Sequence, residues 1–356
     1  MAAMRAVYLA GHGGNEVVTI GERPRPQRRR GEALVRVRAA GLNRVDLYMR
    51  DSGAGITHAL PQIMGLDAAG EVAEIDADET RLKVGDAVVV HPGVTCGRCE
   101  FCLSGARTLC VSMRFIGEHR DGTFAEFVCA PVENVFAKPA PLDWAEAAAL
   151  CTAPITAWRM LFGKARLAPH ETVLVFGVGG AVSSAALQLA KMIGARAIVT
   201  SRDPEKLAWA RGLGADACID GARESVARRA LELTNGRGVD VVIENVGAAV
   251  WSEALKALVR GGRIVTCGAT SGDAPSADLR RLFIRQLQVF GSTHGDFEEF
   301  RALLSVCERG LFRPAIDRRF AFEDAHAALD RLEQGRQFGK IALDAPDAAR
   351  SSAQPH

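Results

Sequence analysis

Four cysteines lie close together in the segment GVTCGRCEFCLSGARTLC (residues 93–110). They are Cys96, Cys99, Cys102 and Cys110, with the spacing C-x2-C-x2-C-x7-C. Thiolates at this density are typical of a closed tetrahedral zinc site, and free buried thiols are the alternative. Because four protein ligands leave no position for water or substrate, we expect one structural zinc per chain, which orders the lobe 93–112.

A second candidate site lies in VLVFGVGGAVSSAALQLAK (173–191), where glycines separate a strand from a helix. Such a turn lets the backbone approach a pyrophosphate, and the helix N-terminus attracts the anion. The third glycine of G-x-G-x-x-G is replaced by Val182, which affects helix packing more than phosphate contact. A tight turn without a ligand is the alternative. The residues expected to bind a dinucleotide are Gly177, Gly179, Gly180, Ala181 and Val182.

The next strand ends in AIVTSRDPEK, where an NAD site usually has an acid for the ribose 2′-OH. Here Ser201 and Arg202 follow the strand, and Lys206 lies one turn further on. A hydroxyl and two cations suit a 2′-phosphate, whereas Asp203 is expected to begin the next helix. NADPH is therefore predicted over NADH, with solvated surface charges as the alternative.

The composition indicates an ordinary globular chain. It has 356 residues, 48% hydrophobic residues and a net charge of +2. This length favours two domains, and the charge argues against a nucleic-acid or membrane-surface partner. We find no apolar run long enough for a membrane span and no signal peptide pattern. Nine cysteines without a secretory signal favour a reducing, cytoplasmic location.

The element pattern changes along the chain. The first part has β-branched runs such as EALVRVRAAGL (32–42), and a helix with the capping pair Asp143 and Glu146 follows. From residue 170 strands alternate with helices, which predicts an α/β fold with a doubly wound parallel sheet. The end of the chain, residues 346–356, is expected to be disordered.

Together these features resemble the medium-chain dehydrogenase/reductase superfamily. The resemblance rests on the cysteine lobe, the glycine turn and the stretches GEHRDGTFAEF, KVGDAVV, AALCTAPITAW and FGKIAL. It implies a GroES-like, β-rich catalytic domain over 1–145, completed by 300–345. It also implies a Rossmann domain over 146–299 and a substrate in the interdomain cleft. The implied activity is hydride transfer with a nicotinamide cofactor.

The resemblance also implies contacts that the residues alone do not reveal. It places the nicotinamide near Asn245, Val246, Cys267 and Gly268. It places the strand RQLQVFGST (285–293) where relatives pair edge to edge, so we expect a homodimer.

One part of the family pattern is missing. Zinc alcohol dehydrogenases hold a catalytic zinc with a Cys, a His and a later Cys. This chain has Asn43 and Leu66 at the first two positions and matches only the third, Cys151. We therefore expect no catalytic zinc and a packed thiol at Cys151. His91 and Asp67 are the alternative ligands.

These departures resemble the zinc-free quinone oxidoreductase and enoyl reductase branch, whose N-x-x-D-x-Y pattern matches Asn43, Asp46 and Tyr48. Asn43 is a candidate hydrogen-bond donor, and Asp46 is expected to orient its neighbours. Tyr48 is a candidate donor or proton source, with a packed aromatic ring as the alternative. The function expected is NADPH-dependent reduction of an activated C=C bond or a quinone. The alternatives are an alcohol dehydrogenase with an atypical metal site and a non-catalytic NADPH-binding protein. The substrate itself stays open.

Overall fold

The structure is a computed structural model that describes residues 2–346. These residues divide into two compact units. The first contains the chain up to Ala153 and again from Asp296 onward, and the second is Pro154–Gly295. The segment expected to be disordered is residues 346–356, and of these, residues 347–356 lie outside the described part of the chain. Throughout the described part, every helix falls short of the length and apolar character that crossing a bilayer requires.

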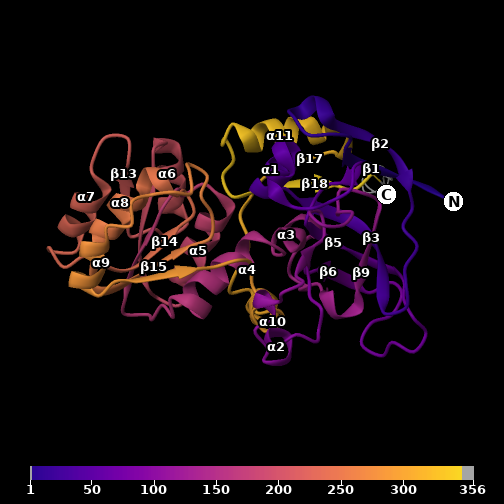
Figure 1. The fold of residues 1–356 in the computed structure, drawn as a ribbon, viewed down its shortest axis with the longest axis horizontal. Coiled ribbons are helices and arrows are strands. Elements are labelled where there is room, and N and C mark those ends of the chain that lie inside the picture. The colour runs from indigo at the N-terminus through magenta and orange to yellow at the C-terminus, as the bar shows by residue number, and fades with distance from the viewer. Residues whose placement is uncertain (1, 347–356) are drawn as a thin grey trace, which may run out of the picture. The chain divides into compact units, whose positions relative to one another are not determined.

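Mostly antiparallel strands build the first unit (Figure 1). Its largest sheet has the order β10-β6-β5-β3-β18-β17, and β9 also pairs with β3. The strands are β3 Glu32–Gly41, β5 Asp67–Glu74, β6 Ala87–Val90, β9 Phe127–Pro131, β10 Val135–Ala137, β17 Ile316–Phe320 and β18 Lys340–Asp344. The smaller sheets contain β1 Ala3–Leu9, β2 Val18–Pro24, β4 Gln62–Ile63, β7 Gly93–Val94 and β8 Arg114–Phe115. The strand-rich first part expected from the sequence is confirmed.

The C-terminal strand completes the sheet begun by the N-terminal segment. Strand β18 pairs antiparallel with β3, with Leu343 opposite Ala40. Figure 1 shows α11 and β18 in yellow beside the indigo helix α1. Both ends contribute to one hydrophobic core, in which Val35 and Val37 lie with Ile341 and Leu343. Residues far apart in sequence therefore meet at β3.

One helix of the first unit begins at a reciprocal pair of capping hydrogen bonds. Asp143 accepts the N–H of Glu146 at 2.9 Å, and Glu146 accepts the N–H of Asp143 at 3.0 Å. This confirms the predicted capping box of α3. The helices are α1 Arg44–Ser52, α2 Glu100–Leu103, α3 Trp144–Ala149, α10 Phe297–Glu308 and α11 Ala325–Glu333. Short 3-10 turns are Asn15–Val17, Gly53–Gly55, Arg107–Leu109, Val132–Asn134 and Phe322–Asp324.

The second unit is a six-stranded parallel sheet with the order β13-β12-β11-β14-β15-β16. The strands are β11 Thr172–Val175, β12 Arg196–Ser201, β13 Ala217–Asp220, β14 Val239–Glu244, β15 Leu258–Thr266 and β16 Gln288–Gly291. The helices are α5 Ala181–Met192, α6 Pro204–Gly212, α7 Val226–Leu233, α8 Ala248–Ala257 and α9 Leu279–Arg285, preceded by α4 Ala153–Trp158 and a π-helix over Arg159–Lys164. The strand order reverses between β11 and β14, where doubly wound sheets bind nucleotides.

Candidate functional site

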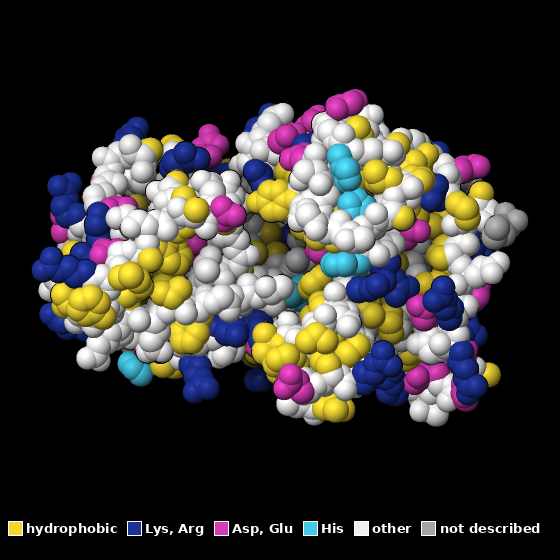
Figure 2. Space-filling view, in the orientation of Figure 1, with side chains coloured by type: hydrophobic (Ala, Val, Ile, Leu, Met, Phe, Trp, Pro, Cys, Tyr) yellow, Lys and Arg dark blue, Asp and Glu magenta, His cyan; other side chains and the backbone are white. Residues whose placement is uncertain are grey.

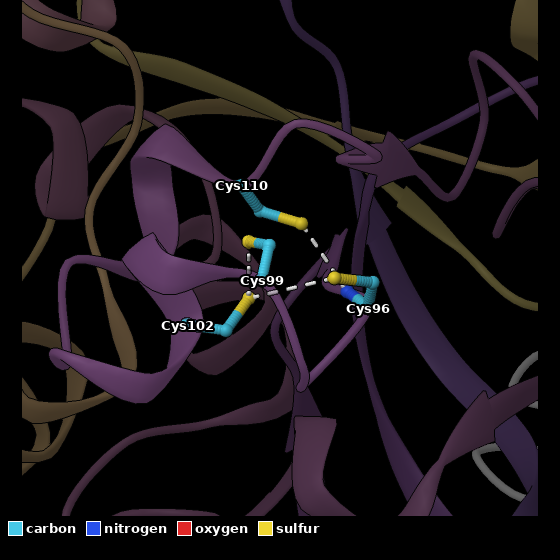
Figure 3. Close-up of side chains that lie close together, drawn as sticks. All are labelled: Cys96, Cys99, Cys102 and Cys110. Carbon is cyan, nitrogen blue, oxygen red and sulfur yellow. Dashed lines mark hydrogen bonds between the residues drawn. The ribbon is translucent and has the colours of Figure 1, made fainter.

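The four cysteines of the lobe point toward one another (Figure 3). Their sulfur atoms all lie within 4.8 Å of one another. Cys99 is the N-cap residue of the short helix α2, and its sulfur lies 3.5 Å from that of Cys102. The sulfurs of Cys96 and Cys102 are 3.9 Å apart, and the N–H of Cys96 points at the sulfur of Cys110 at 3.3 Å.

This arrangement fits one tetrahedral metal ion. Four sulfurs at about 2.3 Å from zinc lie about 3.8 Å apart, close to the separations found here. Backbone N–H groups of Cys102 and Val111 lower the pKa of Cys99 to about 6, which favours a thiolate. Among the described residues, this is the one group of three or more Cys, His, Asp or Glu side chains that could hold a metal.

The glycine turn connects β11 to α5 as the sequence predicted. Gly177 and Gly179 have φ values of +68° and +109°, which side chains with a Cβ rarely adopt. Gly180 is the N-cap of α5, and its carbonyl accepts the hydroxyl of Ser184 at 2.7 Å. Ala181 and Val182 form the first turn, so the free N–H groups of the helix face the end of β11. The turn has the geometry of an anion site.

The alkyl side chain of Lys206 lies directly against this turn. A Cβ at Gly179 would be 2.5 Å from the side chain of Lys206, so glycine makes room for the lysine. Asp203 accepts the N–H groups of Glu205 at 2.8 Å and Lys206 at 3.4 Å, so it caps α6 as expected. Ser201 ends β12, and Arg202 is exposed beside it.

The residues expected around the nicotinamide gather at the carboxyl ends of the central strands. A Cβ at Gly177 would lie 3.5 Å from Val246 and 4.0 Å from Asn245. A Cβ at Gly268 would lie 3.3 Å from the Asn245 carbonyl. Cys267 and Gly268 also line a cavity of about 530 Å³ within this unit.

That cavity contains an acid that the sequence analysis missed. Glu244 is fully buried at the end of β14 and lines the cavity. It accepts the N–H groups of Val246 and Gly247 and the hydroxyl of Thr266, the last at 3.1 Å. Burial raises the pKa of Glu244. The sequence signal that could have identified Glu244 is its position at the end of the apolar run DVVIE. A carboxylate buried there requires hydrogen-bond donors around it.

A buried polar cluster lies in the first unit around Asn43. Asn43 is 7% exposed and directly precedes α1. The ammonium of Lys340 contacts the Asn43 Oδ1 and the Leu42 carbonyl, each at 2.8 Å, and the Asp67 Oδ2 at 2.5 Å. Lys340 and Asp67 are themselves buried, so this is an internal ion pair. No local pattern around Lys340 predicts that it belongs to this site.

The other two candidate catalytic residues lie apart from each other. Asp46 is 1% exposed and accepts the N–H of Asn43 at 2.7 Å. Burial raises the pKa of Asp46 to about 7. Tyr48 is 37% exposed, because residues two apart on a helix point in nearly opposite directions. The structure thus brings Asp46 to Asn43, whereas Tyr48 projects away from this buried cluster.

The comparisons with known proteins cover almost the whole chain. Residues 29–140 match the alcohol dehydrogenase GroES-like domain, and residues 181–309 match the zinc-binding dehydrogenase family. An NAD-dependent alcohol dehydrogenase of Sulfolobus acidocaldarius is 32% identical over 88% of this chain and 92% of its own length. The chain belongs to the medium-chain dehydrogenase/reductase superfamily.

Solved structures of this superfamily share the fold. The crystal structure of an NAD-dependent alcohol dehydrogenase has a TM-score of 0.93 and 37% identity, covering 96% of this chain and 100% of that one. A crotonyl-CoA carboxylase/reductase in complex with NADP has a TM-score of 0.89 and 25% identity, covering 97% and 95%. The GroES-like and Rossmann fold classes expected from the sequence are confirmed, and the protein is an oxidoreductase of this superfamily.

At the position where zinc alcohol dehydrogenases of the superfamily hold a catalytic zinc, this chain has different side chains. Leu66 offers no ligand atom, and the Asn43 oxygen is already bonded to Lys340. Cys151 is buried, its thiol faces the Ala68 carbonyl at 3.5 Å, and burial raises its pKa. His91 packs against the rings of α10, with 4.9 Å between the ring centroids of His91 and Phe297. These residues do not fit a three-ligand zinc site.

Proposed function

We propose that this protein uses a nicotinamide cofactor to reduce an activated C=C bond or a quinone, without a catalytic metal. The observation that carries the proposal is the ammonium of Lys340, bonded to Asn43 and Asp67. A buried positive charge at this place repels a divalent cation. The crotonyl-CoA carboxylase/reductase with the same fold, whose structure contains NADP, supports this class of chemistry.

Such a reaction needs less electrophilic help than carbonyl reduction. Reduction of a simple carbonyl concentrates charge on one oxygen, which zinc stabilises as a Lewis acid. In an enone or quinone the charge spreads through the conjugated system, and hydrogen-bond donors can stabilise the enolate oxygen. Bound NADPH would supply the hydride.

Asn43 is the donor that we assign to this oxygen. Its Oδ1 accepts from Lys340, so its orientation is set and the NH2 group points the other way. The internal partner of that NH2 group is the Gly41 carbonyl at a long 3.4 Å. Lys340 is therefore a positioning residue for Asn43, and Asp67 holds Lys340 in place.

For the cofactor we propose NADPH and one structural zinc per chain. Lys206 against the glycine turn, with Arg202 and Ser201 beside it, supports a 2′-phosphate. Asp203 caps α6, so we do not assign it to the ribose 2′-OH of NAD. The names of the relatives point the other way, because they are named as NAD-dependent enzymes. The four converging sulfurs support the zinc.

The test is NADPH oxidation by the purified protein, with its zinc content counted. We expect turnover of enones, crotonyl thioesters or quinones with one zinc per chain. Turnover of ethanol or simple aldehydes that requires a second zinc would instead support the alternative, an alcohol dehydrogenase, which the names of the relatives favour. Cofactor binding without turnover of any of these substrates would indicate a non-catalytic NADPH-binding protein.

A further inference from the structure

Two histidines from separate loops meet over the end of α1. The ring centroids of His12 and His58 are 5.1 Å apart, with an interplanar angle of 79°. Figure 2 shows histidine side chains gathered on one face of the molecule. Neither residue belongs to the clusters around Asn43 or the four cysteines described above.

Both rings are held in the same tautomer. The Nδ1 of His12 lies 3.1 Å from the Met49 carbonyl, and the Nδ1 of His58 lies 2.7 Å from the Ile56 carbonyl. A carbonyl only accepts, so each Nδ1 carries the proton and each Nε2 presents a lone pair. Metal-binding histidines characteristically donate their other ring N–H in this way.

His91 and His119 lack this arrangement. Their Nδ1 atoms accept backbone N–H groups, from Gly93 at 3.2 Å and Phe115 at 3.1 Å. In the neutral ring the proton is then on Nε2, which leaves no lone pair there for a metal. His294 also places its Nδ1 against a carbonyl, that of Gly295 at 3.1 Å. What distinguishes His12 and His58 is that two rings with this orientation lie in contact.

Glycine at position 53 makes room for both rings. A Cβ at Gly53 would lie 2.6 Å from the His58 Cε1 and 3.3 Å from the His12 Nε2. The His58 Nε2 is buried and has no hydrogen-bond partner among the described residues. An unpartnered buried nitrogen is costly unless a ligand satisfies it.

We propose that His12 and His58 form a binding site for a divalent transition metal such as Zn²⁺. Two imidazoles bound through Nε2 to one tetrahedral zinc have ring centroids roughly 5 Å apart, as found here. Two protein ligands leave open positions, so water or an anionic small molecule would complete the coordination. The site is independent of the cysteine zinc and of the proposed reduction.

The test is calorimetric titration of Zn²⁺ into protein that already holds one zinc per chain. We expect one further ion to bind, and His12→Gln and His58→Gln each to weaken it more than about tenfold. His170→Gln is the matched control, because His170 is an exposed histidine of the other unit. Circular dichroism verifies that each variant is folded.

Cu²⁺ provides a second readout that does not depend on affinity alone. Electron paramagnetic resonance should show two coordinating imidazole nitrogens, and one after His58→Gln. The proposal is overturned if no further Zn²⁺ binds, or if His170→Gln has the same effect as the two variants. It is also overturned if inorganic phosphate rather than Zn²⁺ binds at pH 6 and the two variants abolish that binding, since the rings then act as imidazolium donors.

Discussion

At the scale of single residues, the cluster around Asn43 shows how a buried charge organises polar side chains. Lys340 is bonded to Asp67 and Asn43, and Asp46 holds the backbone of Asn43. Each group has little freedom, because losing a partner would leave an uncompensated buried charge or dipole. Small changes here should therefore have large effects on activity or stability.

Replacing Asn43 by aspartate tests its role as a donor. The variant keeps the shape and the bond to Lys340 but loses the NH2 group. We expect kcat to fall about 10²–10³-fold with little change in KM, as for other oxyanion donors. Steady-state kinetics with the best substrate checks this, and Asn235→Asp in an exposed turn is the control. A rise in KM at unchanged kcat would contradict the assignment.

The raised pKa of Asp46 predicts a pH-dependent stability. Burial raises it to about 7 in the folded protein, against about 3.9 in the unfolded chain. Between these values the folded state keeps a proton that the unfolded chain releases, so stability falls as the pH rises and levels off above the folded pKa. We expect Asp46→Asn to reduce this loss between pH 5 and pH 8 by about 2–3 kcal/mol.

Urea unfolding at both pH values measures this difference. Burial also raises the pKa of Glu118 to about 7, so part of the pH dependence should persist in the variant. Asp78→Asn, at a side chain that is 73% exposed, is the control. An unchanged slope after Asp46→Asn would show that Asp46 is ionised in the folded state.

At the scale of elements, two short segments are organised around ligands. The regular structure of the cysteine lobe is limited to the short helix α2, the 3-10 turn Arg107–Leu109 and the strand β7, which pairs with β8. The turn between β11 and α5 places glycine where a pyrophosphate approaches. Both segments use backbone geometry that the sequence encodes locally.

Loss of one sulfur should release the metal from the lobe. We expect Cys102→Ser to lower the zinc content from about one per chain to near zero, since four-ligand sites depend on every ligand. The lobe 93–112 should then become the first site of limited proteolysis. Elemental analysis and mapping of the cleavage sites measure both effects. Cys218→Ser, outside the lobe, should change neither.

Lys206 should determine the choice of cofactor. Loss of its ammonium in Lys206→Met removes a charge-assisted contact to a 2′-phosphate, worth about 1.5–3 kcal/mol. NADPH binding should weaken about tenfold to a hundredfold, and NADH binding should change little. Fluorescence titration with both cofactors measures this, with Lys256→Met on α8 as the control. A wild-type preference for NADH would refute the 2′-phosphate site.

At the scale of the whole molecule, an edge of the Rossmann sheet is available for pairing. Within residues 2–346, strand β16 is bonded only to β15 and lies at the end of the strand order. Exposed apolar side chains lie on it and on the preceding helix, namely Leu279, Phe283, Ile284 and Val289. Figure 2 shows yellow side chains around the position that α9 occupies in Figure 1. An exposed edge with such neighbours favours association.

We propose a homodimer through this edge. Light scattering should give twice the mass of one chain, and Val289→Asp with Phe283→Asp should shift the protein to the monomer. The control Val84→Asp replaces a similarly exposed apolar residue of the other unit and should leave the dimer intact. A monomeric wild-type protein would rule the dimer out.

The sequence by itself determined the features that depend on neighbours along the chain. The cysteine spacing, the glycine turn and the capping pair Asp143–Glu146 could be predicted because each needs only a few consecutive residues. Tertiary structure decided the rest. Lys340 meets Asn43 across 297 positions because β18 pairs with β3, and His12 meets His58 only where two loops cross. A lysine or a histidine carries no local sign of its partner, since the register of a sheet and the path of a loop are set by packing of the whole core.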